Sequence, residues 1–484
     1  MRRLFVILAF AALAFVPLAS GSGQLKPGSL DPSFGKNGIA TAAVGSASGA
    51  RAVALQTDGK IVAAGQASLG HWHDAFALVR YLRDGSIDLS FGKGGTVTTD
   101  FGASEGIAFG VTVQPDGKTI GVGGFEDSPG DFLLARYLPD GSLDPTFGTD
   151  GKVVTPISQA RAANAVAVQP NGKILAAGGR CSSCGGPYYG SDFALVRYNP
   201  DGSLDQSFGK GGIVTTDFGA DEGVNAFAIL PGGKILAAGG SEEDVYGCNC
   251  LALARYEPNG SLDPSFGIDG KELVSVIDPA TGLALQGPGR FLVTGWTLAR
   301  FKRDGTLDRS FGTNGIRPDF VNQYAQLAVQ PDGKIVSGGT REWRGTRPLA
   351  VAAARYLPDG AWDRSFGKDG RITTSIGTRN SFGFGLALQR NGKIVVAGWG
   401  ADRPLADFAA VRYLGSICTV PRLTGKTVKK AERMIRRSDC SVGRIRRAFS
   451  RSVHKGRVIS QQPRAHTTHP AGTKVSLVVS KGAH

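Results

Sequence analysis

Three short phrases recur seven times along most of this chain, and their regular spacing constrains the fold more than any other feature. The first phrase reads LDPSFG in the first copy, and its phenylalanine recurs at intervals of 57, 56, 61, 58, 45 and 55 residues. A second phrase, LQTDGKIVAAG from Leu55, and a third, FALVRYL from Phe76, complete each copy. A period of about 56 residues indicates an array of one supersecondary unit.

Each unit has the pattern of about four short strands. In the second copy the runs 96–99, 110–114, 118–123 and 132–138 are rich in β-branched or aromatic residues and are bounded by Gly, Pro and Asp. Proline presets the first dihedral of a turn and glycine takes the positive φ that most residues avoid, so Pro115-Asp116-Gly117 predicts a tight turn. The repeat region is therefore expected to be all-β.

Four short strands expose two sheet edges and cannot bury both faces alone, so each unit needs its neighbours. A seven-bladed β-propeller over residues 28–414 supplies them on both sides. An open β solenoid is the alternative, and it would need atypical polar units at its ends. The first and last copies carry the full phrases, which favours the closed ring. The fifth copy, 259–303, is short and is expected to be the least regular.

The three phrases resemble the delta-60 repeat family, which consists of tandem units of this length in exported bacterial proteins. The resemblance covers residues 28–414 and implies a propeller-like array of β units. It implies almost nothing about activity.

Residues that recur in every unit are predicted to be architectural. Asp31 and Arg80 stand for an Asp and an Arg that each copy repeats. Catalysis needs one constellation rather than seven, so these residues are expected to anchor turns or to join neighbouring units. A functional site must then come from what differs between the copies, above all the loop before the last strand.

The variable loops carry polar groups without a specific catalytic motif. His71 and His73 with Asp74 are suitable metal ligands, and the alternative is an ordinary exposed loop. Paired acids, suitable for glycoside chemistry or simply for solvation, occur at Glu126-Asp127 and at 242–244. We predict no catalytic, cofactor-binding or metal-binding residue.

Four cysteines lie in loops of two adjacent units. They are Cys181, Cys184, Cys248 and Cys250. In a cytosolic protein this spacing would suggest zinc or redox work, whereas an exported protein favours structural disulfides. We predict disulfides, and their pairing stays open.

The N-terminus has the pattern of a secretory signal peptide. Two arginines precede an apolar run of 15 residues, and small residues follow it, as at a signal-peptide cleavage site. The run is shorter than the roughly 20 apolar residues that a membrane-spanning helix needs. We predict a signal peptide at 1–21, a linker at 22–27, and a secreted or wall-associated monomer.

The last seventy residues hold nearly all of the net charge of +15. From Gly415 onward sixteen Lys and Arg face two acids, Glu432 and Asp439. Apolar residues at helical spacing predict an amphipathic helix over 427–437, followed by strands that include 456–460 and 474–480.

This segment, 418–482, resembles a PASTA domain. The matching parts are Val420-Pro421, Leu423, Gly425, the helix, VISQQP from Val458 and GTKVSLVVSKG from Gly472. PASTA domains are extracellular modules of wall-sensing kinases and penicillin-binding proteins, so the resemblance implies peptidoglycan as a partner. His466 stands where the family usually has glycine, and an altered turn is expected there. Cys418 and Cys440 bracket the helix and are predicted to form a disulfide.

The basic domain is expected to attract polyanions. The candidate contacts are Lys429, Lys430, Arg433, Arg436, Arg437, Arg444, Arg446 and Arg447. Export and the scarcity of stacking aromatics exclude nucleic acid as the partner, and anionic wall polymers or lipid headgroups fit better. A basic face that serves only solubility is the alternative.

Two hypotheses for the whole chain follow. The first is a non-enzymatic binding or scaffold protein, whose tail docks on the cell wall and whose propeller presents a surface for a glycan or a protein. The second is an exported hydrolase or lyase that acts on a glycan, with its site in the variable loops.

Overall fold

The computed structural model describes residues 25–70, 74–102, 106–125, 131–157, 162–179, 192–219, 221–242, 250–275, 277–342, 348–400, 406–470 and 473–483. The predicted signal peptide, 1–21, lies outside the described residues, as does 22–24 of the predicted linker. Among the described residues no helix is long and apolar enough to cross a membrane.

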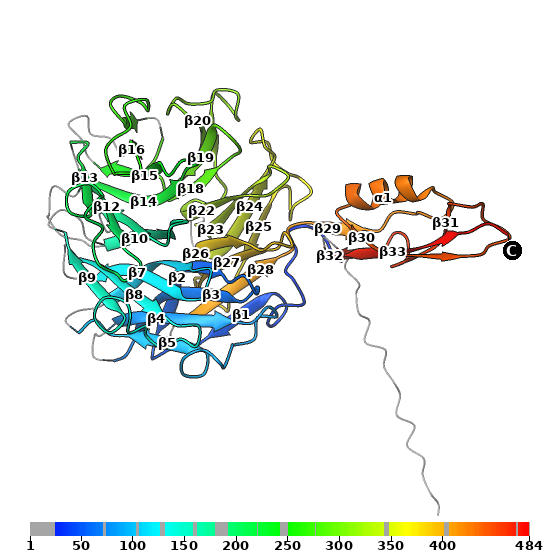
Figure 1. Cartoon of the computed structure of the whole chain (residues 1–484), viewed down its shortest axis with the longest axis horizontal. Helices are drawn as coiled ribbons and strands as arrows, with labels where there is room; N and C mark the ends of the chain where they lie inside the picture. Colours follow the sequence, from blue (N-terminus) through cyan, green and yellow to red (C-terminus); the bar gives the residue numbers. More distant parts are fainter. Residues whose placement is uncertain are drawn as a thin grey trace, which may run out of the picture.

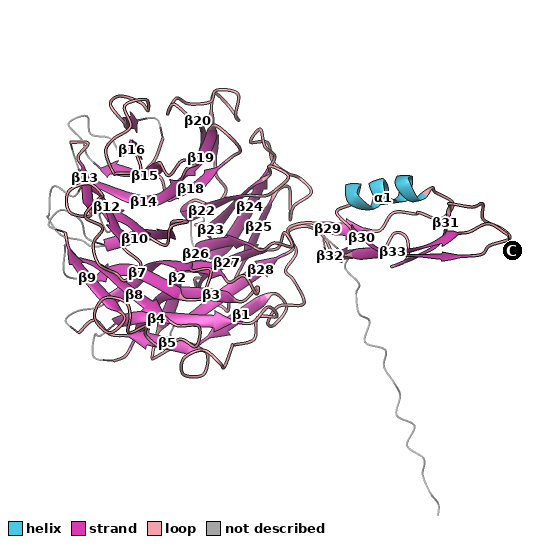
Figure 2. Cartoon of the chain, in the orientation of Figure 1, coloured by secondary structure: helices cyan, strands magenta, loops and turns pink. Residues whose placement is uncertain are grey.

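In the described part of the chain, 28 strands form seven sets of four antiparallel strands arranged as a ring (Figures 1 and 2). From the inner to the outer strand the sets are β2 (Ser48–Leu55), β3 (Ile61–Ser68), β4 (Asp74–Tyr81), β5 (Thr96–Thr99); β6 (Gly106–Val113), β7 (Thr119–Phe125), β8 (Asp131–Tyr137), β9 (Lys152–Pro156); β10 (Ala162–Val168), β11 (Ile174–Gly179), β12 (Phe193–Tyr198), β13 (Ile213–Thr216); β14 (Asp221–Ile229), β15 (Ile235–Glu242), β16 (Cys250–Tyr256), β17 (Lys271–Val274); β18 (Gly282–Leu285), β19 (Arg290–Thr294), β20 (Thr297–Lys302), β21 (Ile316–Pro318); β22 (Gln323–Val329), β23 (Ile335–Arg341), β24 (Ala350–Tyr356), β25 (Arg371–Thr374); and β26 (Phe382–Leu388), β27 (Ile394–Gly400), β28 (Asp407–Tyr413), β1 (Ile39–Ala42).

The ring is closed. Each inner strand contacts the inner strand of the next set, from β2 through β22 to β26, and β26 contacts β2. The cores lie between neighbouring sets: buried side chains of β7 and β8 cluster with those of β11 and β12. Neighbouring units therefore cover one another's faces, which confirms the all-β propeller and excludes the open solenoid.

The outer strand of each set comes from the following sequence unit. The four runs predicted for the second copy, 96–99 to 132–138, do not form one sheet, because β5 pairs with β4 of the preceding unit, Phe76 opposite Thr99. In the same way β1, near the N-terminus, pairs with β28, the last strand of the ring, with Ile39 opposite Val411. The two ends of the propeller thus complete one sheet together.

A bulge in the inner strand explains the last glycine of the second phrase. In the fourth set the register shifts between Val224 and Ala226, which pushes a carbonyl toward the neighbouring strand. A Cβ at Gly239 would lie 1.7 Å from the carbonyl oxygen of Gly223, so only glycine fits. The fifth set lacks this shift, and its strands are only 4, 5, 6 and 3 residues long, which confirms that it is the least regular.

Tyrosine hydroxyls of the third phrase join neighbouring sets. The hydroxyl of Tyr256 donates to Thr216 Oγ1 at 2.9 Å. Four other tyrosines form the same hydrogen bond with a Thr or Asp of the preceding set, in the pairs Thr99–Tyr137, Thr155–Tyr198, Asp319–Tyr356 and Thr374–Tyr413. Where the tyrosine is replaced by Phe301, the opposite residue is Val274. At this position an apolar ring therefore faces an apolar partner.

Replacing Ala42 by Thr is expected to stabilise the propeller by about 1 kcal/mol. Tyr81 is fully buried and its hydroxyl has no hydrogen-bond partner among the described residues, because Ala42 stands where the partners of the five bonded tyrosines are Thr or Asp. Urea unfolding measures the gain. Ala42→Val, which adds the same bulk without a hydroxyl, is the matched control, and an equal gain from both variants would refute the hydrogen-bond explanation.

The C-terminal domain is separate from the ring (Figure 1). Its elements are β29 (Ile417–Thr419), α1 (Val428–Arg437), β30 (Ser441–Ala448), β31 (Val458–Gln462), β32 (Thr468–Pro470) and β33 (Lys474–Ser480). β33 lies between β30, to which it is parallel, and β31, and β29 pairs with β32. This arrangement confirms the predicted helix and both predicted strand regions.

The core of this domain is small and is joined by a disulfide. Ala431 and Ile435 of α1 pack with Val475, Leu477 and Val479 of β33. The predicted bond between Cys418 and Cys440 is present, with a sequence separation of 22. In the turn at His466 this residue itself adopts the left-handed conformation that glycine favours, with φ of 65°.

Candidate functional site

The three repeated phrases converge on one carboxylate in every unit. Asp88 Oδ2 lies 2.7 Å from Arg80 Nε and 2.9 Å from Lys60 Nζ, while its Oδ1 accepts from Ser90 Oγ. The guanidinium of Arg80 lies 4.4 Å from the ring centre of Phe91. The other six units have the same ion pair, with distances of 2.5 to 2.9 Å between Arg Nε and Asp Oδ2; its aspartates are Asp31, Asp144, Asp205, Asp263, Asp308 and Asp363.

These carboxylates are ionised in the folded ring. Burial by itself raises the pKa of Asp88, but hydrogen bonds from Ser90 and Lys60 and the charge of Arg80 outweigh it and lower the pKa below its ordinary value. The pKa of the corresponding Asp is also lowered in the other six units. Each pair therefore stabilises the ring above the unfolded pKa of about 3.9, and this contribution is lost as the pH falls.

The same arginines join each unit to the next. Arg80 Nη1 donates to the carbonyl of Pro139, and the amide of Gly92 donates to the carbonyl of Asp140, at 2.6 Å. Both acceptors belong to the following set. The prediction that the repeated Asp and Arg are architectural is confirmed.

At the closure these bonds connect the two ends of the propeller. Arg412 Nε lies 2.7 Å from Asp31 Oδ2, and Lys393 Nζ lies 2.6 Å from the same oxygen. The amide of Gly28 donates to the carbonyl of Leu414 at 2.6 Å. Residues 27–31 thus occupy the place that a further repeat would fill after Leu414.

The ring has two different faces. The turn face holds the connections between inner and second strands, such as 56–60, which are four or five residues long in all seven sets. The variable face holds the connections between second and third strands, which range from two residues (295–296) to thirteen (180–192). Because β28 runs toward the turn face, the C-terminal domain leaves the ring there, away from the variable face.

The polar residues singled out in the variable loops lie mostly outside the described residues. These are His71, His73, Glu126, Asp127, Glu243, Asp244, Cys181, Cys184 and Cys248. Asp74, which is described, accepts from Gln66 Nε2 at 3.0 Å. Cys250 is buried at the start of β16 and is disulfide-bonded.

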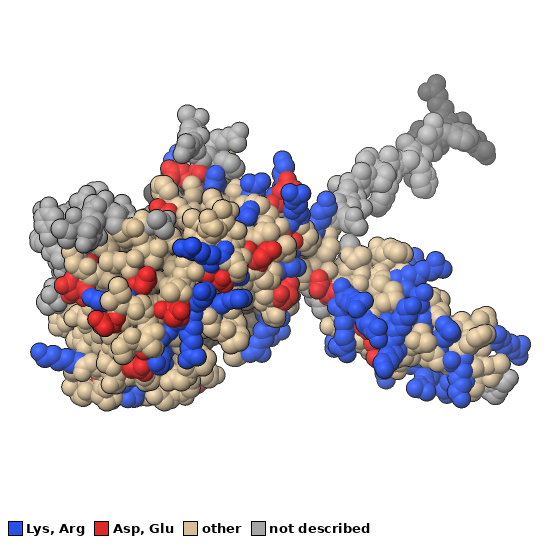
Figure 3. All heavy atoms as spheres, turned by 90° about the horizontal axis from the view of Figure 1, so that it is seen from above, with Lys and Arg blue, Asp and Glu red and all other residues tan. Residues whose placement is uncertain are grey.

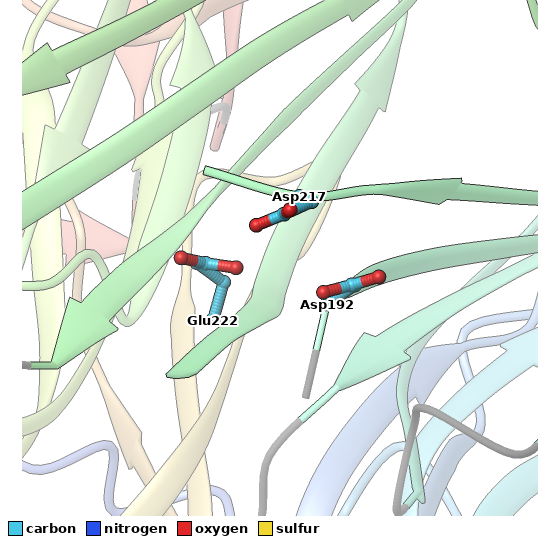
Figure 4. A group of neighbouring side chains, drawn as sticks. All are labelled: Asp192, Asp217 and Glu222. Carbon is cyan, nitrogen blue, oxygen red and sulfur yellow. The ribbon is translucent and has the colours of Figure 1, made fainter. Parts of the chain in front are cut away.

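Three carboxylates meet on the variable face, between the third and fourth sets (Figure 4). One oxygen each from Asp192, Asp217 and Glu222 lies within 4.8 Å of the others. Burial, and then the charge of Asp217, raises the pKa of Asp192. Oxygen ligands of this kind suit a hard cation such as Ca²⁺. The sequence did not reveal this group, because its members lie 25 and 5 residues apart and only the packing of neighbouring sets brings them together.

On the face seen in Figure 3, Lys and Arg gather most densely on the C-terminal domain. All eight predicted contacts, Lys429, Lys430, Arg433, Arg436, Arg437, Arg444, Arg446 and Arg447, are exposed. Lys429, Lys430, Arg433 and Arg437 line a shallow hollow of about 360 Å³ on the outside of α1 together with Thr427 and Met434. The three arginines of β30 are not part of this hollow.

Two family models match the chain. The PASTA domain model matches residues 419–481. The model described as a domain of unknown function (DUF5122) β-propeller matches 56–91, 114–147, 169–208, 231–266 and 330–366. Each of these five segments contains a complete Lys–Arg–Asp set. The two unmatched units are the short one, in which Arg290 replaces the lysine, and the one that Asp31 and Arg412 share between the two ends.

Several solved propellers are similar at low identity. The WD40 β-propeller domain of Doa1 has 13% identity and a TM-score of 0.43, covering 77% of this chain and 97% of that chain. A gluconolactonase from Xanthomonas campestris has 11% identity and a TM-score of 0.36, covering 77% and 89%. The β-propeller domain of the Trilobed protease from Pyrococcus furiosus has 12% identity and a TM-score of 0.37, covering 76% and 94%. The propeller fold of this chain itself follows from its strand pairing and from the family model.

Proposed function

We propose that this chain, a DUF5122-type β-propeller repeat protein that ends in a PASTA domain, is an exported binding protein of the cell envelope. Its basic domain associates with peptidoglycan or an anionic wall polymer. Its propeller is non-enzymatic and presents the variable face to a second ligand, a glycan or a protein.

The division of charge between the two parts supports this proposal. Sixteen basic residues lie in the last seventy positions, from Gly415 onward, whereas the ring is close to neutral. In the ring the repeated charges are paired internally, as Asp88 is with Arg80 and Lys60. The C-terminal domain therefore offers the free cationic surface, and a PASTA domain is a wall-binding kind of module.

The place where the domain leaves the ring is the observation that carries the proposal. Gly415 follows β28 on the turn face, and its carbonyl accepts from Arg355 as the carbonyl of Pro139 accepts from Arg80. The chain therefore leaves the ring from a fixed point. A molecule held by its C-terminal domain keeps the variable face, on the other side of the ring, open to solvent.

Cosedimentation with purified cell wall tests the proposal. The full chain is expected to pellet with wall at low salt and to be released as the ionic strength rises toward 1 M, where screening shortens to about 3 Å. An unrelated protein of similar size and low net charge in the same tubes controls for trapping. A chain that stays in the supernatant at low salt would contradict the proposal.

A further inference from the structure

The outer face of α1 is a continuous stripe of cations. Ala431 and Ile435 are buried, so the opposite side of the helix faces solvent. Lys429, Arg433 and Arg437 follow one another at intervals of four residues on that side, with Lys430 beside them. Eight residues of helix place Lys429 and Arg437 about 12 Å apart along the axis.

Part of this stripe opposes the stability of its own helix. Like charges four residues apart repel, and Lys429 and Lys430 in the first turn face the positive end of the helix dipole, whereas Arg437 in the last turn lies at its favourable end. The first turn contains no acidic residue, and among the described residues the ion pairs of the chain lie in the propeller. A local arrangement that costs stability without an internal partner indicates a binding surface.

The chemistry of the stripe selects its ligand. Lysine and arginine offer only donors, and one lone pair of the Thr427 hydroxyl already accepts from the amide of Lys430 at 3.4 Å. Sugars and peptides bring donors of their own that need acceptors here. The phosphate groups of a phosphodiester chain bring only acceptors and one negative charge each, and the arginine fork binds phosphate oxygens in pairs.

We propose that the outer face of α1, through Lys430, Arg433 and Arg437, binds a phosphodiester polymer of the wall. This inference rests on the proposed function and names its ligand class. The hollow between these side chains holds successive phosphates along the helix, and their charge relieves the repulsion within the stripe.

Two triple variants of the full chain test the role of the stripe. Lys430→Gln/Arg433→Gln/Arg437→Gln removes three of its four cations, leaves Lys429, and keeps good helix formers. Arg451→Gln/Lys455→Gln/Arg464→Gln removes the same charge from exposed sites elsewhere in the domain. Binding to inorganic polyphosphate is expected to weaken about a hundredfold in the first variant and severalfold in the second. Equal losses would overturn the stripe as the site. Equally tight binding of poly-glutamate by the parent would overturn the preference for phosphate.

Stripped wall separates this inference from the proposed function. The parent is compared on native wall and on wall from which the phosphodiester polymers have been removed by mild acid. Retention on native wall but not on stripped wall supports both wall binding and the phosphodiester ligand. Equal retention on both walls would overturn the phosphodiester ligand and leave wall binding in place, whereas no retention on either would overturn both.

Discussion

Replacing Arg412 by Gln is expected to destabilise the propeller by about 3 kcal/mol. Arg412 lies on the last strand of the ring, and its guanidinium contacts Asp31 at 2.7 Å and the ring of Phe34 at 4.3 Å. It also donates to the carbonyl of Arg83, in the first set. The variant loses all three contacts at the point where the two ends meet, while Lys393 still faces Asp31.

Urea unfolding measures this loss, and amide exchange locates it. Exchange is expected to accelerate most in β1, the strand that Arg412 helps to hold. Arg309→Gln, which removes an exposed arginine of the first repeated phrase, is the control for loss of one positive charge and is expected to change stability by less than about 0.5 kcal/mol. If Arg412→Gln unfolds like the control, the closure does not depend on this pair.

Replacing Cys418 and Cys440 together by Ser is expected to destabilise the C-terminal domain by about 3 kcal/mol. The bond closes a loop with a sequence separation of 22, and the chain-entropy model assigns about 3 kcal/mol to a loop of this size. The domain has one small core cluster, so this is a large share of its stability.

Amide exchange in β33 is the appropriate measurement, because all five tryptophans lie in the propeller and do not report on this domain. Faster exchange at Val475, Leu477 and Val479 is expected, with no change in the ring. Unchanged exchange at these three residues would show that the small core holds the domain without the bond.

The repeat predicted the architecture but not where one sheet ends and the next begins. A periodic sequence can be divided at any point, and the phrase LDPSFG begins a unit only by convention. The pairing of β5 with β4 and of β1 with β28 depends on the turn that Asp88 and Asp31 hold with their arginines. The fifth copy has Arg290 in place of the repeated lysine, and this arginine keeps the positive charge beside Asp308.

Contacts between units could not be predicted from the sequence. Asp192 and Glu222 meet only because neighbouring sets pack together, and no local pattern joins residues 30 positions apart. The cations of α1 were predictable, because helical periodicity alone places Lys429, Arg433 and Arg437 on the face opposite Ala431. That the arginines of β30 lie outside the hollow lined by α1 could be seen only in the structure.

The repeated residues build the ring, and we propose that the basic domain makes the contact with the wall. The most direct test is cosedimentation with purified wall at low salt of a chain that ends at Ser416, which keeps Gly415 as the partner of Arg355. The core clusters of the ring contain no residue beyond Leu414, so this shortened chain is expected to fold. It is predicted to remain in the supernatant while the full chain pellets, and pelleting of both to the same extent would contradict the account.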